Sequence, residues 1–247
     1  MERIELLKAL TGSHNYNLAT EDSDKDYKIF VAPTFEDLYK GNQYKKNIVT
    51  NVVDKDIKDI RQLPSLLYKS NLAYLELLFS DEIDVHDERL YELIRLRDNI
   101  VKMNLPQLFK STGGMFINRM KRIDHATEGT QHLVDKYGYN TKEAMHGFRS
   151  LYVLVRFAEN NFSGMGYVLK HTANMRRYML GIKNGDYGSK EEAVKYITYY
   201  HDTFFAPLKE EYCNQKPNEE LKEYIDYLIM EVVKDYILNQ SIAMEGN

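Results

Sequence analysis

Two aspartates one residue apart stand at the head of a short apolar run, and a Gly-Ser pair precedes them. Gly12-Ser13 is followed by ten residues, then by Asp24-Lys25-Asp26 and the apolar run 27–31. This run has the composition of a β-strand. Because alternate residues of a strand point to the same face, we expect the two aspartates to point the same way. The pattern therefore predicts a strand together with two carboxylates at its start.

The same residues supply groups that phosphate chemistry needs. Carboxylates bind Mg²⁺, which offsets triphosphate charge during phosphoryl or nucleotidyl transfer. Asp24 and Asp26 are the predicted metal ligands. Gly12 allows close approach of the backbone, and Ser13 can open a helix whose N–H groups face a phosphate. Lys28, two residues beyond the second aspartate, is predicted to share its face and to contact phosphate.

A third carboxylate would complete a two-metal site and accept the proton of an attacking hydroxyl. Residues 47–53 form a second β-branched run, which ends at Asp54. We expect Asp54 to lie beside the first two aspartates across a sheet. Asp56 and Glu76 are alternatives that the sequence leaves open, and Asp56 is also the expected cap of a following helix.

The chain changes character after about residue 80. The preceding part mixes short β-like runs with helical segments, whereas residues from about 88 onward show mostly helical periodicity. Residues 4–10 fit a short helix or a helix that runs into a strand. We predict an α+β fold with two domains. Residues 1–84 should form a small mixed sheet with helices, and residues 85–247 an all-helical domain.

Composition limits the classes of binding partner and the cellular compartment that we expect for this chain. The 247 residues carry a formal net charge of −4, so any nucleic-acid partner needs a local basic patch. The single cysteine, Cys213, rules out an internal disulfide and suits a reducing compartment. The N-terminus is too charged for a signal peptide, and no apolar run approaches the roughly 20 residues of a membrane span. These features predict a soluble, cytoplasmic protein without a membrane partner.

A basic stripe occurs in the predicted helical domain. Lys142, His146 and Arg149 stand at i, i+4 and i+7, hence on one helix face. They are predicted to bind the triphosphate of a nucleotide, or an acidic acceptor, from the helical side of a cleft. The alternative is a solvated basic face without a ligand.

The segment 12–31 resembles the signature of the DNA polymerase β-like nucleotidyltransferase superfamily: Gly-Ser, about ten residues, then Asp-x-Asp with apolar neighbours. Lys25 departs from the pattern, which usually has an apolar residue there. The chain is more closely similar to predicted nucleotidyltransferases associated with RNA repair, which phages often encode. The similarity lies in residues 12–26, Lys69-Ser70-Asn71, and residues 75–80, 142–149 and 182–185.

This resemblance implies an enzyme that transfers a nucleoside monophosphate from an NTP, such as ATP, to a hydroxyl and releases pyrophosphate. On the family's pattern Asp24 and Asp26 bind Mg²⁺ or Mn²⁺, and Asp54 falls at the third carboxylate position, which would make residues 1–84 the catalytic domain. The acceptor stays open between RNA or tRNA, a protein side chain and a small molecule. A catalytically silent member that binds a nucleotide or a protein partner is a further alternative. The oligomeric state is not indicated.

Overall fold

The computed structural model describes residues 3–21, 23–50 and 52–245. The chain divides into two compact units: Met1–Asn104 with Pro217–Asn247 form unit 1, and Leu105–Lys216 form unit 2. This grouping differs from the predicted boundary between residues 84 and 85. Residues 86–104, which follow the sheet, belong to unit 1, and so does the C-terminal helix. The α+β fold, a mixed sheet at the N-terminal end followed by many helices, is as predicted.

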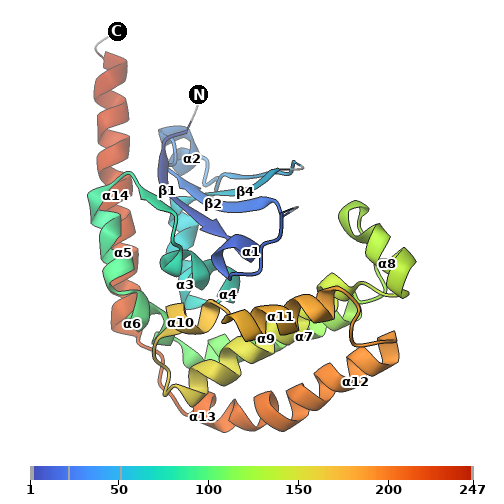
Figure 1. Ribbon diagram of the computed structural model, residues 1–247. Coiled ribbons are helices and arrows are strands. Elements are labelled where there is room, and N and C mark those ends of the chain that lie inside the picture. Colours follow the sequence, from blue (N-terminus) through green and yellow to red (C-terminus); the bar gives the residue numbers. More distant parts are fainter. Residues whose placement is uncertain (1–2, 22, 51, 246–247) are drawn as a thin grey trace. The chain divides into compact units, whose positions relative to one another are not determined.

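A five-stranded sheet of order β3-β4-β2-β1-β5 forms the centre of unit 1 (Figure 1). Its strands are β1 (Glu5–Thr11), β2 (Lys25–Val31), β3 (Lys45–Ile48), β4 (Val53–Asp59) and β5 (Ile83–Val85). The pair β2–β4 is parallel and the other pairs are antiparallel. The expected helix within residues 4–10 is wrong, because these residues pair along β2 as strand β1.

One face of the sheet carries an apolar cluster. It consists of Leu10, Tyr27, Ile29 and Val31, against which Tyr44, Val53 and Ile57 pack. The opposite face presents Asp26, Lys28 and Phe30 from β2, since side chains alternate along a strand. There the ring of Tyr74 in α4 (Leu72–Leu75) meets the ring of Phe30, with centroids 6.4 Å apart. The site therefore lies on the face that α4 contacts.

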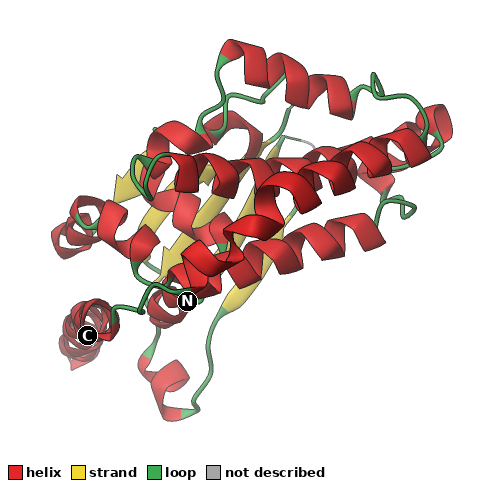
Figure 2. Cartoon of the chain, turned by 90° about the horizontal axis from the view of Figure 1, so that it is seen from below, coloured by secondary structure: helices red, strands yellow, loops and turns green. Residues whose placement is uncertain are grey.

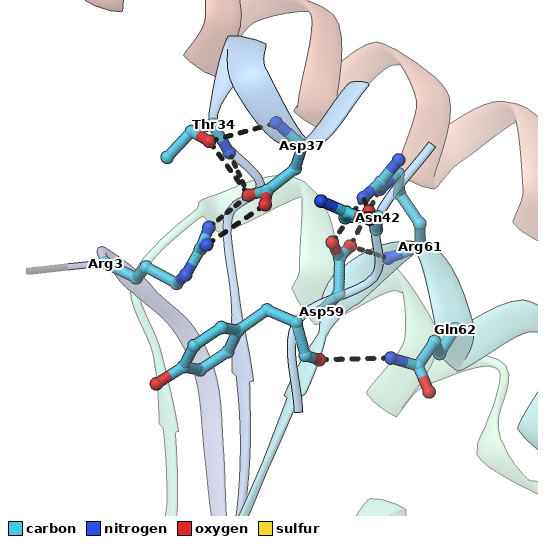
Figure 3. Close-up of polar contacts among 8 residues, drawn as sticks. Arg3, Thr34, Asp37, Asn42, Asp59, Arg61 and Gln62 are labelled. Atoms are coloured by element: carbon cyan, nitrogen blue, oxygen red, sulfur yellow. Dashed lines mark hydrogen bonds and ion pairs between the residues drawn. The ribbon is translucent and has the colours of Figure 1, made fainter. Parts of the chain in front are cut away.

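Helix α2 (Phe35–Tyr39) connects β2 to β3, and Thr34 caps it as the sequence suggests. The side-chain oxygen of Thr34 accepts a hydrogen bond from the backbone N–H of Asp37. In return, the carboxylate of Asp37 accepts a hydrogen bond from the backbone N–H of Thr34 at 2.8 Å. Figure 3 shows that the same carboxylate also meets the guanidinium of Arg3. The hydrogen bonds from Arg3, together with those from Thr34, outweigh burial and lower the pKa of Asp37 to about 2.

Short helices and the long C-terminal helix complete unit 1. They are the 3₁₀ segments η1 (Ile60–Gln62), η2 (Glu76–Phe79) and η3 (Glu88–Leu90), and helices α1 (Gly12–Asn15), α3 (Leu63–Tyr68), α5 (Tyr91–Arg95), α6 (Arg97–Lys102) and α14 (Glu219–Glu245). Helix α14 packs against η1 and α3 and buries Ile225, Ile229 and Val232. This apolar packing places the C-terminal helix in unit 1.

Unit 2 is helical, and the strands drawn yellow in Figure 2 all belong to unit 1 within the described residues. Its helices are α7 (Leu105–Lys121), α8 (Gln131–Tyr137), α9 (Thr141–Glu159), α10 (Met165–Leu169), α11 (Ala173–Lys183), α12 (Lys190–Tyr200) and α13 (Lys209–Cys213), with short 3₁₀ and π segments at Glu128–Thr130, His201–Phe205 and Ala206–Leu208. Helix α9 is largely buried and packs against α7, α11 and α12. Gly147 of α9 faces α7, since a Cβ built on it would lie 3.5 Å from Cβ of Arg119 and 3.6 Å from Cδ2 of Phe116. No helix in the described ranges has the length and apolarity required to span a membrane.

Candidate active site

The register of the two parallel strands brings together aspartates that are 28 residues apart in the sequence. Asp26 of β2 is the Cα partner of Asp54 of β4, and Asp24 immediately precedes β2. Each of the three residues offers one carboxylate oxygen, and these oxygens all lie within 4.8 Å of one another. We call Asp24, Asp26 and Asp54 the carboxylate triad. All three are half-buried.

Gly12 makes room for one member of the triad. It has φ of +70°, and a Cβ built on it would lie 2.1 Å from Oδ2 of Asp26. The backbone here therefore requires a glycine both for its left-handed conformation and for the close carboxylate. Ser13 follows within the single turn of α1. The structure thus places the Gly12-Ser13 turn directly against the triad.

Hydrogen bonds fasten the loop between α1 and β2. The Nε2 atom of His14 donates to the carbonyl of Ser23 at 3.1 Å. The hydroxyl of Thr11 donates to the carbonyl of Asp26 at 3.3 Å, and the N–H of Thr20 donates to Oγ of Ser23 at 2.9 Å. These hydrogen bonds hold the chain on both sides of Asp24. They give His14 a structural role in positioning the loop.

Asp54 reaches the triad by a route that differs from the prediction. It does not end a strand that spans 47–53, because a turn separates β3 from β4 within that run. Thr50 in this turn donates its N–H to Oδ1 of Asp54 at 3.0 Å and its hydroxyl to the carbonyl of Val53 at 2.7 Å. Thr50 therefore orients the carboxylate. It was not among the predicted site residues, although a threonine three residues before a strand is a signal for such a hydroxyl turn.

Asp56 lies one row farther along β4 and does not cap a helix, which corrects the prediction. Its carboxylate accepts from the hydroxyl of Tyr74 at 2.9 Å and pairs with Lys58 at 2.9 Å and with Lys28 at 3.4 Å. Burial acts to raise the pKa of Asp56, but the interactions with Lys58, Lys28 and Tyr74 lower it overall. Asp56 is thus occupied by cations of the protein and is not a member of the triad.

Lys28 shares the face of Asp26, as predicted from the alternation of β2. Its ammonium lies 4.5 Å from the centre of the Tyr74 ring as well as beside Asp56. Burial is the main cause of its lowered pKa, which the nearby carboxylates of Asp56 and Asp26 partly offset. Lys28 therefore places a partly buried cation immediately behind the triad.

Glu76, the other alternative for the third carboxylate, has a different environment. It is buried, and its carboxylate accepts a hydrogen bond from the hydroxyl of Tyr16. Its carbonyl lies 3.4 Å from Nδ2 of Asn15, which donates to it. Glu76 therefore ties the chain that follows the Gly12-Ser13 turn to η2. Of the three candidates, Asp54 is the one that the structure brings to the first two aspartates.

The predicted basic stripe lies on α9 of unit 2. Lys142 is exposed, His146 is half-buried and Arg149 is buried. Burial, with the nearby cations Arg119, Arg149, Lys142 and Lys183, lowers the pKa of His146. Burial and Arg149 likewise lower the pKa of the buried His171 to about 3. The stripe thus combines two cationic side chains, Lys142 and Arg149, with one imidazole whose pKa is lowered.

The donor set fits the metal that the sequence predicts. Three carboxylates are hard oxygen ligands of the kind that Mg²⁺ and Mn²⁺ take, and Oδ1 of Asp54 is oriented by a backbone amide. No cysteine or histidine belongs to the group within the described residues, so a zinc-type site is not indicated there. The three carboxylates at this strand pair are the residues that could hold such a cation.

A mixed sheet that carries this triad beside a Gly-Ser turn defines the class of a DNA polymerase β-like nucleotidyltransferase domain. The sequence model of the RlaP family, described as the RNA repair pathway DNA polymerase beta family, matches residues 4–161. This match covers more than half of the chain, and the chain therefore belongs to that family. It confirms the resemblance to nucleotidyltransferases associated with RNA repair. A comparison with curated proteins found no match.

Proposed function

We propose that this protein is a metal-dependent nucleotidyltransferase that moves a nucleoside monophosphate from an NTP to a hydroxyl and releases pyrophosphate. The observation that carries the proposal is the carboxylate triad, with one oxygen of each member within 4.8 Å of the others. The close packing of Gly12 against Asp26 supports it, because it leaves a backbone turn beside the carboxylates. Membership of a nucleotidyltransferase superfamily gives the reaction class.

In this proposal Asp24, Asp26 and Asp54 hold Mg²⁺ or Mn²⁺. The metal supplies neutralisation of phosphate charge when it is bound. The acceptor oxygen forms a bond to the α-phosphorus while the bond between that phosphorus and the oxygen leading to the β-phosphate breaks. Asp54 accepts the proton of the attacking hydroxyl, and Thr50 keeps its carboxylate oriented through the 3.0 Å hydrogen bond.

The NTP phosphates require further binding groups. We assign the backbone of the Gly12-Ser13 turn to them, and the cation Lys28 behind the triad. Lys142, His146 and Arg149 share a face of α9 within unit 2, and we propose them separately as nucleotide-binding residues of that unit, in which the lowered pKa of His146 favours its neutral form. The family match extends through all three, since it ends at residue 161.

RNA or tRNA is the acceptor class that the family description favours, since it names an RNA repair pathway. The transfer would take place in the cytoplasm, an assignment that the single Cys213 suits. A protein side chain, a small molecule, or binding without catalysis are the outcomes that would replace this assignment.

The test supplies each α-³²P-labelled NTP in turn, with Mg²⁺ or Mn²⁺, to the full chain and pools of RNA, proteins and small molecules. We expect metal-dependent label in the RNA pool and release of pyrophosphate. Asp24→Asn combined with Asp26→Asn should abolish both. The matched control is Asp84→Asn combined with Asp226→Asn, which removes two exposed carboxylates elsewhere in unit 1. Unchanged transfer by the triad variant would refute the proposal, and label in another pool would replace the acceptor.

A further inference from the structure

Two of the groups that we assign to the NTP phosphates are anchored to the same short segment of unit 1. The Gly12-Ser13 turn belongs to α1 and Lys28 belongs to β2, whereas residues 72–79 form α4 and η2. Two side chains of this segment, Tyr74 and Glu76, connect it to Lys28 and to the turn. They stand two residues apart in the sequence, so one short piece of backbone is connected to both groups.

Glu76 holds the chain that follows the turn. Its carboxylate accepts a hydrogen bond from the hydroxyl of Tyr16, and its backbone carbonyl accepts one from Nδ2 of Asn15 at 3.4 Å. The carbonyl of Ser13 accepts hydrogen bonds from the N–H groups of Tyr16 at 3.3 Å and Leu18 at 2.9 Å. Tyr16, Asn15 and Glu76 are buried. The hydroxyl of Tyr16 therefore links the backbone of the turn to the carboxylate of Glu76.

Tyr74 holds Lys28 both through Asp56 and through its own ring. Its hydroxyl donates to Oδ2 of Asp56 at 2.9 Å, and the ammonium of Lys28 lies 3.4 Å from the same oxygen. The ammonium also lies 4.5 Å from the centre of the Tyr74 ring, which is a cation–π contact. Burial, followed by the hydrogen bond to Asp56, raises the pKa of Tyr74, so its hydroxyl stays protonated and donates.

The segment that carries Tyr74 and Glu76 is anchored in the core of unit 1. Asn71 caps α4, because its side-chain oxygen accepts the N–H of Ala73 at 3.1 Å. The apolar side chains of the segment are buried, namely those of Leu72, Leu75, Leu77, Leu78 and Phe79. A closely packed core permits little displacement of its side chains. Tyr74 and Glu76 are therefore held in fixed positions relative to each other.

We propose that Tyr16 and Tyr74 are positioning residues for NTP binding. Their hydroxyls, each bound to a carboxylate, hold the Gly12-Ser13 turn and Lys28 at the spacing that the phosphates of an NTP require. The two tyrosines act through these phosphate-binding groups. This inference rests on the proposed function and adds two residues to it.

The metal ligands are held by other contacts. Asp54 accepts the N–H of Thr50 at 3.0 Å, and Asp26 packs against Gly12. Loss of either tyrosine hydroxyl should therefore weaken binding of the nucleotide and spare binding of the metal. If the two hydroxyls served stability alone, neither affinity would change while the folded state became less stable.

The experiment measures two affinities of the full chain. Calorimetry at saturating Mn²⁺ gives the affinity for the α,β-methylene analogue of each NTP, which cannot be cleaved, and electron paramagnetic resonance gives the affinity for Mn²⁺ alone. Tyr16→Phe and Tyr74→Phe each remove one hydrogen bond that fixes a phosphate-binding group. We expect each variant to lose about fivefold in nucleotide affinity, while its Mn²⁺ affinity changes by less than about twofold.

The matched control is Tyr27→Phe. Tyr27 is also buried, and its hydroxyl donates to the carboxylate of Glu82, but its side chain belongs to the apolar cluster on the opposite face of the sheet. The control therefore loses one hydroxyl–carboxylate hydrogen bond of the same kind and should keep both affinities. Thermal unfolding of the three variants without ligand establishes that each is folded at the temperature of the binding measurements.

Equal nucleotide affinity in Tyr16→Phe, Tyr74→Phe and the control would overturn the inference, and so would a parallel loss of Mn²⁺ affinity in the first two. Failure of the proposed function gives a different result. Nucleotide binding that depends on both hydroxyls, without nucleotidyl transfer by the unaltered chain, would reject catalysis and keep the inference. Transfer and nucleotide binding that are unaffected by loss of either hydroxyl would do the reverse, and no binding of any analogue by the unaltered chain would reject both.

Discussion

A Cβ on Gly12 would lie 2.1 Å from Oδ2 of Asp26, so residue 12 and the carboxylate share a space that holds only one of them. The pairing of β1 with β2 brings the two residues together, because Thr11, which precedes Gly12, is the Cα partner of Asp26. The Gly-Ser turn and the Asp-x-Asp strand, separated by ten residues in the sequence, are therefore one packed unit. The position of Asp26 in the triad depends on the absence of a side chain at residue 12.

Gly12→Ala should disrupt the site as well as the local backbone. The left-handed conformation, with φ of +70°, costs alanine about 1–2 kcal/mol, and the contact with Asp26 adds to it. The matched control is Gly41→Ala, which has φ of +67° but open space around the added methyl group. Thermal unfolding and Mn²⁺ titration of both variants separate strain from the contact.

We expect both alanine variants to be less stable, and Gly12→Ala alone to be deficient in Mn²⁺ binding. Equal Mn²⁺ affinity in the two variants would show that the packing of residue 12 against Asp26 does not position the triad.

Asp54→Asn and Asp56→Asn should differ in their effects on metal-free stability and on Mn²⁺ binding, although the two residues lie on the same face of β4. Asp56→Asn removes the partner of Lys28 and Lys58 and should lower the free energy of unfolding by about 1–3 kcal/mol while Mn²⁺ binding persists. Asp54→Asn relieves repulsion among three carboxylates and should leave metal-free stability equal or higher, but remove stabilisation by Mn²⁺. Denaturant unfolding with and without Mn²⁺ measures both.

If Asp56→Asn abolished Mn²⁺ binding while Asp54→Asn retained it, the third ligand would be Asp56.

Asp37 should contribute a pH-dependent stability through its contact with Arg3. Its pKa in the folded chain is about 2, below the usual 3.8, so the folded state favours the ionised carboxylate. The contribution, about 2 kcal/mol, is complete above about pH 4 and disappears as the pH falls from about 4 toward 2. Asp37→Asn should remove this part of the pH dependence, measured by urea unfolding between pH 2.5 and 6. Asp84→Asn, an exposed aspartate of β5, should leave it intact, and identical profiles for the two variants would contradict the assignment.

Lys142→Gln tests the assignment of the α9 stripe to the nucleotide. Lys142 is exposed, so its removal should spare the fold. An exposed cation that contacts phosphate contributes about 1 kcal/mol, and its removal should raise KM for the NTP about fivefold with little change in kcat. Lys121→Gln removes an exposed lysine near the end of α7 and should leave KM unaltered. An equal change in both variants would assign the effect to general charge.

Much of the site was predictable because its signals are local. Residues 27–31 form a strand and Thr34 caps α2, each for a reason visible within a few residues. The contact of Gly12 with Asp26 was not predicted, because it depends on the pairing of β1 with β2. Alternation along β2 also predicted that Lys28 shares the face of Asp26. Local alternation and capping depend on the chemistry of neighbouring residues, which the sequence contains.

The second strand was harder to predict. The β-branched run 47–53 has strand propensity throughout, yet it contains the turn between β3 and β4, and Asp54 stands near the start of the next strand. The turn is stabilised by Thr50 and by the pairing of β4 with β2, which are interactions beyond the run itself. Asp56 was expected to cap a helix for the same reason, since its partners Lys28 and Tyr74 come from other elements.

Residue chemistry at short spacing was enough to indicate the family, the strand with its two aspartates and the glycine turn. Which acid joins the two aspartates depends instead on pairing between distant segments. The parallel register of β2 and β4 places Asp54 beside Asp26 and places Asp56 where it pairs with Lys28 and Lys58. The carboxylate of Glu76 instead accepts a hydrogen bond from Tyr16. A shift of one residue in that register would turn Asp54 to the other face of the sheet. The register is fixed by cross-strand hydrogen bonds and by packing of the core.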